Sequence, residues 1–561
     1  RNPADQEAKN RTDQRTVATS DLAYLHHDDD YHRHSVSGGG HAHCGAMIYL
    51  GDNWPEKYRG TFFTNNLHGN RVNNDRLLPR RSTYVGEHAD DFLFGNDPWF
   101  RGMSVKYGPD GGVYVSDWHD YGECHDSDGS HRTSGRIYKV TYGEARPRSI
   151  NLQENTNLEL AELQNHPNAW VLRRARRILH ERHSRGEDVA DARNRLASVV
   201  ESQADEIQRL RALWALQTLD GQQMCETLLC HGDESEHLRR WALRLIADSS
   251  DCDMCFAAGA ERNWIPARYF QRLASLADSD PSAKVRLELA CALQRLAPEH
   301  RLDLASRLLR HAEDATDPYL PLMIWYGVEP AVADHVSEAL QVEADSQKPS
   351  VRKYTARRIA DMPSPPLESI VKQALVCEER VAADLLNGMA ESLTLRGSQK
   401  APDSWNKLYL RLENADSHEL RSVGLQLSLL FGNQDVIEKT RQVVMDRSND
   451  AAVRRNAFRS LLAIDHGLRT DHLHKLLSSE PHLRKDALTA LLQTNNEKTA
   501  QVLLRQFPQL SAEEKRLAVS VLVTRARFAS ALLSGIDNAS AVAIFSRPCN
   551  RKTRHRNLGR R

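Results

Sequence analysis

An apolar residue followed by arginine recurs through most of this chain, and each pair opens a stretch rich in alanine and leucine at helical spacing. The pairs end in Arg173, Arg211, Arg239, Arg286, Arg352, Arg421, Arg454 and Arg484. Neighbouring pairs lie roughly 30–47 residues apart, or about twice that, which is the period of two-helix HEAT or armadillo repeats. One such repeat cannot bury its apolar face alone. Residues 148–546 are therefore predicted to stack as a HEAT-like α-helical solenoid.

Residues 38–147 are rich in glycine, aromatic and β-branched residues instead. Short alternating runs at 46–49, 61–64, 112–116 and 136–140 are separated by turn sequences such as 108–112, a pattern typical of antiparallel strands. A propeller blade uses roughly 40–50 residues and a ring needs four to eight blades, so this segment cannot close a ring by itself. Either blades upstream of this sequence complete a β-propeller of which residues 38–147 are the last blades, or the strands pair in another way. Residues 1–37 are predicted to be a linker or the remnant of a preceding blade.

Composition excludes several classes of function. Lysine plus arginine number 75 and aspartate plus glutamate number 75, so no net charge attracts nucleic acid. No apolar run approaches the roughly 18 residues of a transmembrane helix. The nine cysteines are scattered, which is not a disulfide framework. The basic tail 547–561 is predicted to be disordered, with a nucleic-acid tail as the alternative reading.

Several motifs of the β-rich segment point to one family. They include GGGHAHCG at 38–45, YLGDNWPEKYRG at 49–60 and YGPDGGVYVSDW at 107–118. Their order resembles the last blades of glucose/sorbosone dehydrogenase-like propellers. In detail the chain resembles the membrane-bound dehydrogenase family of planctomycete-type bacteria, in which such a propeller precedes HEAT-like repeats. HPNAW at 166–170 and DPYLPLMIWY at 317–326 extend the resemblance into the helical part.

The resemblance implies a quinoprotein that binds pyrroloquinoline quinone (PQQ), oxidises a sugar or polyol, and passes electrons to a C-terminal domain of the cytochrome c family. It also implies an extracytoplasmic location, periplasmic or membrane-associated. Two departures matter. The blades that usually hold the catalytic base are expected upstream of residue 1, so no catalytic residue is assigned. The haem motif Cys-x-x-Cys-His is missing, because Cys255 is followed by Phe256, and no haem is expected.

Four residues are candidate cofactor ligands. Asn65, His68 and Arg71 follow a predicted strand, and Arg101 follows an aromatic turn. In sugar dehydrogenase-like propellers, side chains at such positions face the central cavity, where a guanidinium can bind cofactor carboxylates bidentately. The alternative is ordinary ion pairing at strand ends.

If the cavity reading holds, His68, Arg71 and Arg101 converge on one face of the β segment. Two arginines that face one space repel each other, so an acid or anion must lie between them. Asp97 or Asp117 is the expected partner when no cofactor is bound.

Two weaker patterns suggest metals. Glu123, Asp126 and Asp128 lie close to a glycine, as in a small calcium loop, although a solvated acidic turn explains them as well. His41 and His43 share one face if they lie on a strand, and could ligate one metal or only hydrogen-bond within the glycine-rich turn.

Two functions follow as hypotheses. The first is a fragment of a PQQ-dependent dehydrogenase-like protein that is not catalytically complete by itself. The second is a non-enzymatic scaffold whose solenoid binds a protein partner on its concave face.

Overall fold

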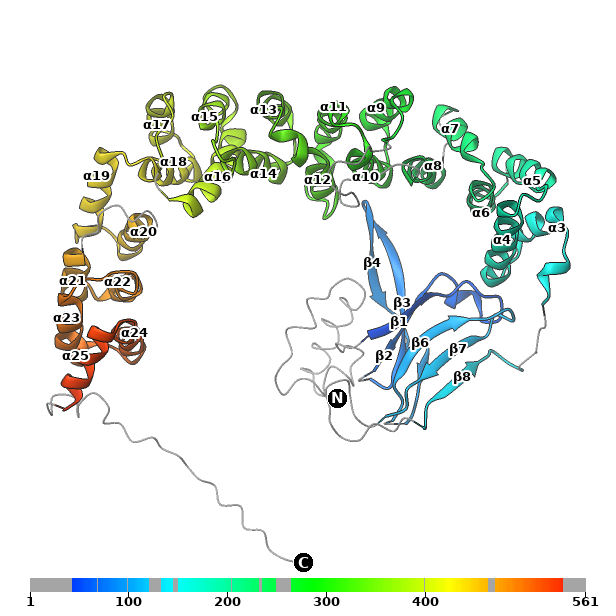
Figure 1. Ribbon diagram of the computed structural model, residues 1–561, viewed down its shortest axis with the longest axis horizontal. Helices are drawn as coiled ribbons and strands as arrows, with labels where there is room; N and C mark the ends of the chain where they lie inside the picture. Colours follow the sequence, from blue (N-terminus) through cyan, green and yellow to red (C-terminus); the bar gives the residue numbers. More distant parts are fainter. Residues whose placement is uncertain are drawn as a thin grey trace, which may run out of the picture. The chain divides into compact units, whose positions relative to one another are not determined.

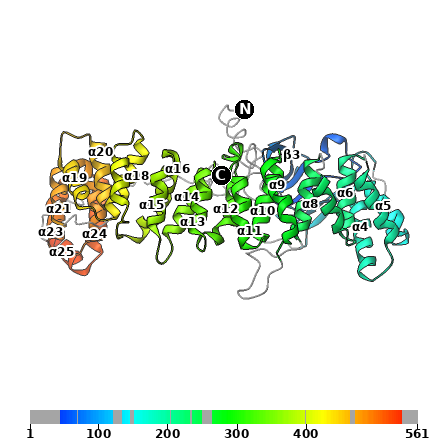
Figure 2. The same ribbon diagram turned by 90° about the horizontal axis from the view of Figure 1, so that it is seen from above.

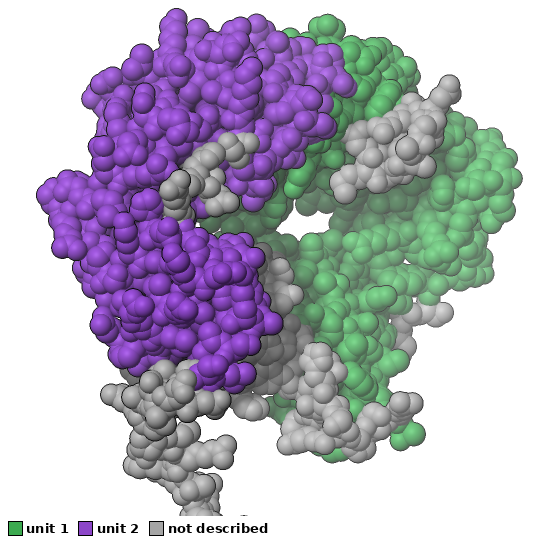
Figure 3. Space-filling model, turned by 60° about the vertical axis from the view of Figure 1, so that its left-hand side comes forward, with its two compact units in different colours: residues 1–331, 345–348 green, residues 332–344, 349–561 purple. Residues whose placement is uncertain are grey.

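The computed structural model describes residues 43–537 apart from 68, 98, 121–132, 145–149, 203, 232–234, 249–263, 398 and 463–469. An antiparallel β region comes first and helices follow, as Figure 1 shows. The chain divides into two compact units, residues 1–331 with 345–348 and residues 332–344 with 349–561 (Figure 3). The predicted order of β structure before α structure is confirmed.

The β region holds two antiparallel sheets. The strands are β1 (His43–Ile48), β2 (Phe62–Asn66), β3 (Arg71–Arg80), β4 (Thr83–His88), β5 (Leu93–Phe94), β6 (Gly102–Tyr107), β7 (Val113–Asp117) and β8 (Arg136–Val140). The first sheet has the order β1-β2-β3-β4, with β5 also paired to β3, and the second has the order β6-β7-β8. Four of these strands fall on the predicted runs. The predicted turn at 108–112 joins β6 to β7, and its Gly111 has a φ of 73°, which favours glycine.

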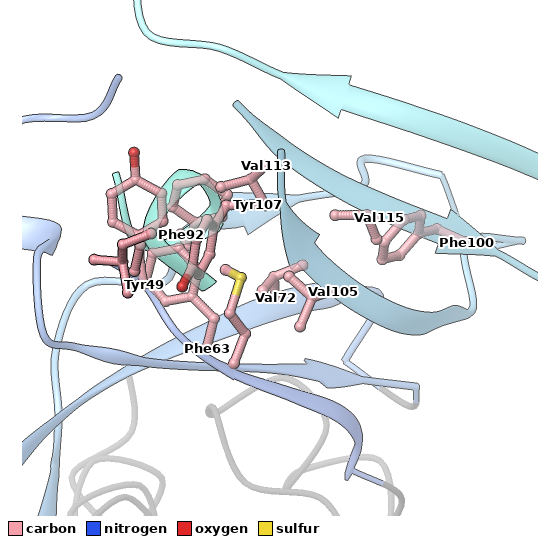
Figure 4. Close-up of a cluster of buried hydrophobic side chains, with 12 residues drawn as sticks. Tyr49, Phe63, Val72, Phe92, Phe100, Val105, Tyr107, Val113 and Val115 are labelled. Atoms are coloured by element: carbon pink, nitrogen blue, oxygen red, sulfur yellow. The ribbon is translucent and has the colours of Figure 1, made fainter. Parts of the chain in front are cut away.

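An aromatic and aliphatic core joins the two sheets (Figure 4). Phe63 of β2 stacks on Phe92 with ring centroids 4.3 Å apart. Tyr49 meets Tyr107 edge to face at 5.7 Å, and its hydroxyl donates to the carbonyl of Gly111 at 2.8 Å. The buried hydroxyl is thereby satisfied, so the ring contributes its full area to the core.

Beyond residue 150 the described residues form helices and no strand. The α-helices of the first unit are α3 (Asn157–Glu162), α4 (Ala169–Ser184), α5 (Ala190–Glu201), α6 (Glu206–Gln217), α7 (Gln222–His231), α8 (Glu236–Asp248), α9 (Phe270–Ser279), α10 (Ala283–Ala292), α11 (Pro298–Leu309) and α12 (Leu320–Val332). Those of the second unit are α13 (Val336–Asp345), α14 (Pro349–Ala360), α15 (Leu367–Val376), α16 (Glu379–Arg396), α17 (Trp405–Glu413), α18 (His418–Leu430), α19 (Gln434–Met445), α20 (Ala451–Leu462), α21 (Thr470–Ser479), α22 (Arg484–Leu491), α23 (Lys498–Gln506), α24 (Ala512–Val523) and α25 (Ala526–Asp537). None of the described helices is long and apolar enough to cross a membrane.

Within each unit the helices pack in two rows (Figures 1 and 2). Most even-numbered helices contact an odd-numbered neighbour in sequence, and several also contact the next even-numbered helix: α6 with α8 and α8 with α10 in the first unit, α14 with α16, α16 with α18 and α22 with α24 in the second. We call the even-numbered helices the even row and the odd-numbered helices the odd row. These contacts join helices that are close in sequence, and the helices bury apolar side chains against one another.

Two arginines of the apolar-Arg pairs join neighbouring pairs of helices. Arg239 of α8 donates from Nε and Nη2 to both carboxylate oxygens of Asp280, at 2.7 and 3.0 Å. Arg286 of α10 makes the same bidentate contact with Asp314, at 2.6 and 2.8 Å. Both guanidinium groups are buried, so these charge-assisted contacts are shielded from water. Arg239 and Arg286 are thus structural links between helices that are close in sequence.

The β region is fastened to α4 through Asn168, which is fully buried. Its side-chain oxygen accepts from the backbone N–H of Trp170 and caps the helix, while its amide nitrogen donates to Asp52 Oδ1 at 2.9 Å and to the carbonyl of Gly108 at 3.1 Å. Leu172 extends from α4 into the core of the two sheets. The HPNAW motif therefore joins the helical part to the β region.

The β3–β4 hairpin reaches a second point of the helical part. At its tip, Ser82 donates from its hydroxyl and its backbone N–H to the carboxylate of Asp317, at 2.7 and 3.2 Å. Asp317 also accepts from the backbone N–H groups of Tyr319 and Leu320 at the start of α12. The DPYLPLMIWY motif thus begins with the residue that holds the hairpin.

Candidate functional site

One face of the first sheet is polar and buried. On β3 the side chains of Arg71, Asn73 and Asp75 alternate with those of Val72 and Asn74, so the two sets lie on opposite faces. The register pairs Asn66 with Arg71, and Asp75 with His88 of β4, which brings polar side chains from three strands onto one face. All three of the alternating polar residues on β3 are buried. Buried polar side chains in this number must satisfy one another.

A chain of charged contacts runs across this face. His88 Nδ1 lies 2.8 Å from Asp75 Oδ1, and His88 Nε2 lies 3.5 Å from Asp91 Oδ1. Asp91 Oδ2 in turn accepts from Arg71 Nη1 at 3.2 Å. All four side chains are at least nine-tenths buried. We call Arg71, Asp75, His88 and Asp91 the buried charge cluster.

The chemistry of this cluster is that of a buried ion-pair network. His88 Nδ1 lies at hydrogen-bond distance from the Asp75 carboxylate, whereas Asp91 Oδ1, 3.5 Å from Nε2, makes no hydrogen bond among the described residues. The carboxylate of Asp75 therefore fixes the orientation of the imidazole ring.

Asn65 lies on the opposite face from Arg71. Its side chain packs where two backbones approach closely, because a Cβ at Gly102 would overlap the Asn65 amide. The side chain is fully buried, and neither amide atom has a hydrogen-bond partner among the described residues. Asn65 and Arg71 thus come from neighbouring strands but do not share a face.

Arg101 immediately precedes β6 and is also buried. Its backbone N–H donates to Asp117 Oδ1 at 2.8 Å, and its Nη1 donates to the carbonyl of Phe100 at 3.0 Å. Asn70 Nδ2 donates to the same carbonyl at 2.8 Å, so the residues that precede Arg71 and Arg101 are in contact.

The two expected acid partners both pair with Arg136. Its Nη2 lies 2.9 Å from Asp97 Oδ2 and 3.4 Å from Asp117 Oδ2. Asp97 also accepts from the backbone N–H of Trp99, and this hydrogen bond, followed by the one from Arg136, lowers the pKa of Asp97.

Several predicted site residues lie outside the described residues: His41, His68, Glu123, Asp126 and Asp128. The convergence of His68 with the two arginines and the calcium loop therefore stay predictions. His43 is described and lies on β1, where it pairs with Asn66.

Sequence reasoning missed Asp75, His88 and Asp91. The signal that could have found them is the alternation of Arg71, Asn73 and Asp75 in a run that also contains hydrophobic residues. The pairing partner of Asp75 could not be read from sequence, because it depends on the register of a hairpin whose strands were not predicted.

One further group has the composition of a metal site. His311, Glu313 and Asp314 have potential ligand atoms within 4.8 Å of one another. Arg286 pairs with both carboxylates, and Lys348 Nζ donates to the His311 carbonyl. Two cations thus already occupy the surroundings of this cluster, which disfavours a divalent ion there.

A search of curated proteins found no match. Among solved structures, an engineered protein from a structural genomics programme is 16% identical, with 66% of this chain and 98% of that chain covered and a TM-score of 0.26, a likeness that carries no functional argument. Residues 1–144 match the family model described as a domain of unknown function, DUF7133.

Proposed function

We propose that this chain is a protein-binding scaffold, in which a HEAT-like α-solenoid is carried behind part of a dehydrogenase-like β-propeller. The observation that supports the proposal is the contact between successive even-row helices within each unit, such as α6 with α8 and α16 with α18. Packing between neighbours builds a continuous surface instead of one closed core, and repeat proteins use such surfaces to bind partners on their concave face. Within each unit, the even row would form that binding surface.

The candidate cofactor residues support a structural reading of the β region. Arg71 is held by Asp91, and the guanidinium of Arg101 donates to a backbone carbonyl. To form a bidentate contact with a cofactor, Arg71 would first have to break its buried ion pair with Asp91.

A second proposal keeps the quinoprotein reading, in which the complete protein is a PQQ-dependent sugar or polyol dehydrogenase. The Asn65 amide favours it, because it is buried without a hydrogen-bond partner among the described residues, and a buried polar group of this kind is rare unless a ligand or water completes it. As a set, however, the candidates do not fit the cofactor: Asn65 and Arg71 lie on opposite faces of the sheet. No reaction step is therefore assigned to these residues.

The scaffold proposal is tested by placing bulky charges on one row at a time. Ser422 of α18 and Asn456 of α20 are exposed on the even row. Asn406 of α17 and Gln434 of α19 are exposed on the odd row and serve as the matched control. Protein partners captured by the full chain in its source cells are first identified by cross-linking, and their affinity is then measured with the purified chain.

We expect the double variant S422R/N456R to weaken the partner's binding by about tenfold or more, which is roughly 1.4 kcal/mol. The double variant N406R/Q434R should bind as the unchanged chain does. Equal binding by both double variants would contradict the proposed even-row interface.

A further inference from the structure

A cleft of about 660 Å³ lies where the edges of the two sheets meet α4. Strands β1 and β6 are edge strands of their sheets and lie against each other, and α4 provides the third wall. This volume falls within the range of pockets that hold small organic molecules. The cleft contains none of the residues of the buried charge cluster.

The inner lining of the cleft is apolar and aromatic. Met47 of β1 and Val105 and Tyr107 of β6 are buried, and Trp170 of α4 is half-buried. A flat apolar ligand could pack on these side chains, because aromatic rings and aliphatic chains offer a large apolar contact area.

The remaining lining is strongly cationic. Lys106, Arg173, Arg174 and Arg177 all face the cleft. Arg177 is paired with Glu181 at 2.7 Å, one turn along the helix. Across the described residues, no carboxylate lies within ion-pair distance of the other three. Three positive charges therefore surround an apolar pocket without compensation.

Tyr107 gives a second, independent sign of a ligand. It is only 8% exposed, and within the described part of the chain its hydroxyl proton has no acceptor, because the side chain that interacts with the hydroxyl, that of Arg173, can only donate. Arg173 lies over its ring, 5.9 Å from the centroid. Burial raises the pKa of Tyr107 against the opposing effect of Arg173, so the hydroxyl stays protonated and can donate to an anion.

The helices behind the cleft add to the positive charge. Burial, and then the neighbouring charges of Arg173 and Arg211, lower the pKa of Arg176 to about 10. Arg176 Nη2 donates to Gln164 Oε1 at 3.2 Å and to the Arg211 carbonyl at 3.3 Å, so its polar contacts are with neutral groups. The field at the cleft is therefore positive and favours an anion.

From these observations we infer that the cleft binds a small amphipathic anion, an aromatic or aliphatic body that carries a carboxylate, sulfonate or phosphate. The body lies against Met47, Tyr107 and Trp170. Its anionic group is held by Arg173 and Arg174, and Tyr107 donates its hydroxyl proton as a hydrogen bond. This inference does not depend on the scaffold proposal.

The test uses 1-anilinonaphthalene-8-sulfonate as the probe, titrated into the full chain and followed by its fluorescence. We expect one saturable site that 1-naphthoate displaces. The neutral analogue N-phenyl-1-naphthylamine should bind at least about tenfold more weakly, because it lacks the charge-assisted contacts.

Variants locate the site. The double variant R173E/R174E should weaken dye binding by at least about tenfold. The matched control is R185E/R195E, which makes the same change of charge at two exposed arginines outside the cleft and should leave dye affinity unchanged. Both variants are checked for an unchanged far-ultraviolet circular dichroism spectrum.

A measurement on the unchanged chain tests the inference even if the variants fail to fold. Dye binding should slow amide hydrogen exchange in residues 46–48 and 104–107. The inference is overturned if this protection is absent, if the two double variants bind the dye equally, or if an acidic peptide displaces the dye and 1-naphthoate does not.

Discussion

Arg286 and Asp314 form a buried bidentate ion pair, with Nε to Oδ2 at 2.6 Å and Nη2 to Oδ1 at 2.8 Å. The arginine lies on α10, and the acid lies in the connection that precedes α12. Arg286 Nη1 also donates to the carbonyl of Asp280, at 2.8 Å. One side chain therefore ties together α10, the connection before α10 and the connection before α12.

Replacing Arg286 by alanine should destabilise the first unit by about 3–5 kcal/mol, because Asp314 would be left buried without its partner. Urea unfolding of the full chain, with hydrogen exchange of residues 283–315, measures the loss. The control is Arg177→Ala, which removes an exposed pair with Glu181 and should cost less than about 1 kcal/mol. Similar losses in the two variants would show that the buried pair is not special.

Replacing Asn168 by alanine removes the cap of α4 and leaves Asp52 Oδ1 and the Gly108 carbonyl without this donor. We expect a loss of about 2–4 kcal/mol, the sum of a lost cap and unsatisfied buried acceptors. Asn433→Ala is the matched control, since Asn433 caps α19 alone, and should cost about 1 kcal/mol. Thermal unfolding distinguishes the two, and an equal shift would refute the joining role of Asn168.

The hairpin contact at Asp317 should depend on pH. Burial acts to raise the pKa of Asp317, but hydrogen bonds from Leu320, Ser82 and Tyr319 outweigh it and lower the pKa. The contact is therefore fully present above the unfolded value, near pH 4, and is lost as the pH falls through the lower folded pKa.

Hydrogen exchange of residues 76–88, corrected for the intrinsic pH dependence, follows this contact. Exchange should accelerate below about pH 4 in the unchanged chain, and should already be fast at pH 7 in Asp317→Ala. Ser82→Ala removes one of the donors and should give an intermediate rate. Exchange that is independent of pH and of both substitutions would contradict the proposed docking.

We expect His88 to stabilise the fold because it lies between the carboxylates of Asp75 and Asp91. His88→Leu leaves Asp75 and Asp91 facing an apolar side chain and should cost about 2–4 kcal/mol. Adding Asp75→Asn removes one of the uncompensated charges and should restore part of the loss. The free energies of unfolding of the two single variants and the double variant are then compared. If Asp75→Asn costs as much in the His88→Leu background as it costs alone, the two residues do not interact.

The sequence predicted the parts of the fold that depend on local pattern. Helical spacing predicted that helices follow the β region, because the apolar pattern and the capping contacts of a helix depend on residues close in sequence. The run at 46–49 predicted part of β1. The hairpin β3–β4 was missed because Asn73 and Asn74 favour turns and Pro79 disfavours a strand, although its pairing with β2 and β4 overrides these preferences.

The candidate site was harder to predict, for a physical reason. Arg71 was found because arginine at a strand end is conspicuous, yet its partner Asp91 is twenty residues away and meets it only through the fold. The cationic run Arg173–Arg177 was visible in the sequence. Its role beside Tyr107 depends on how α4 lies against β1 and β6, which no local pattern specifies.

The central claim is that the described β region is a structural part of a scaffold and not a complete quinone site. Equilibrium dialysis of the full chain with PQQ and calcium tests this claim most directly. The account predicts that any PQQ retained is the same for the unchanged chain and for the double variant R71A/R101A, once both are shown to be folded. Stoichiometric binding by the unchanged chain that the double variant loses would contradict it.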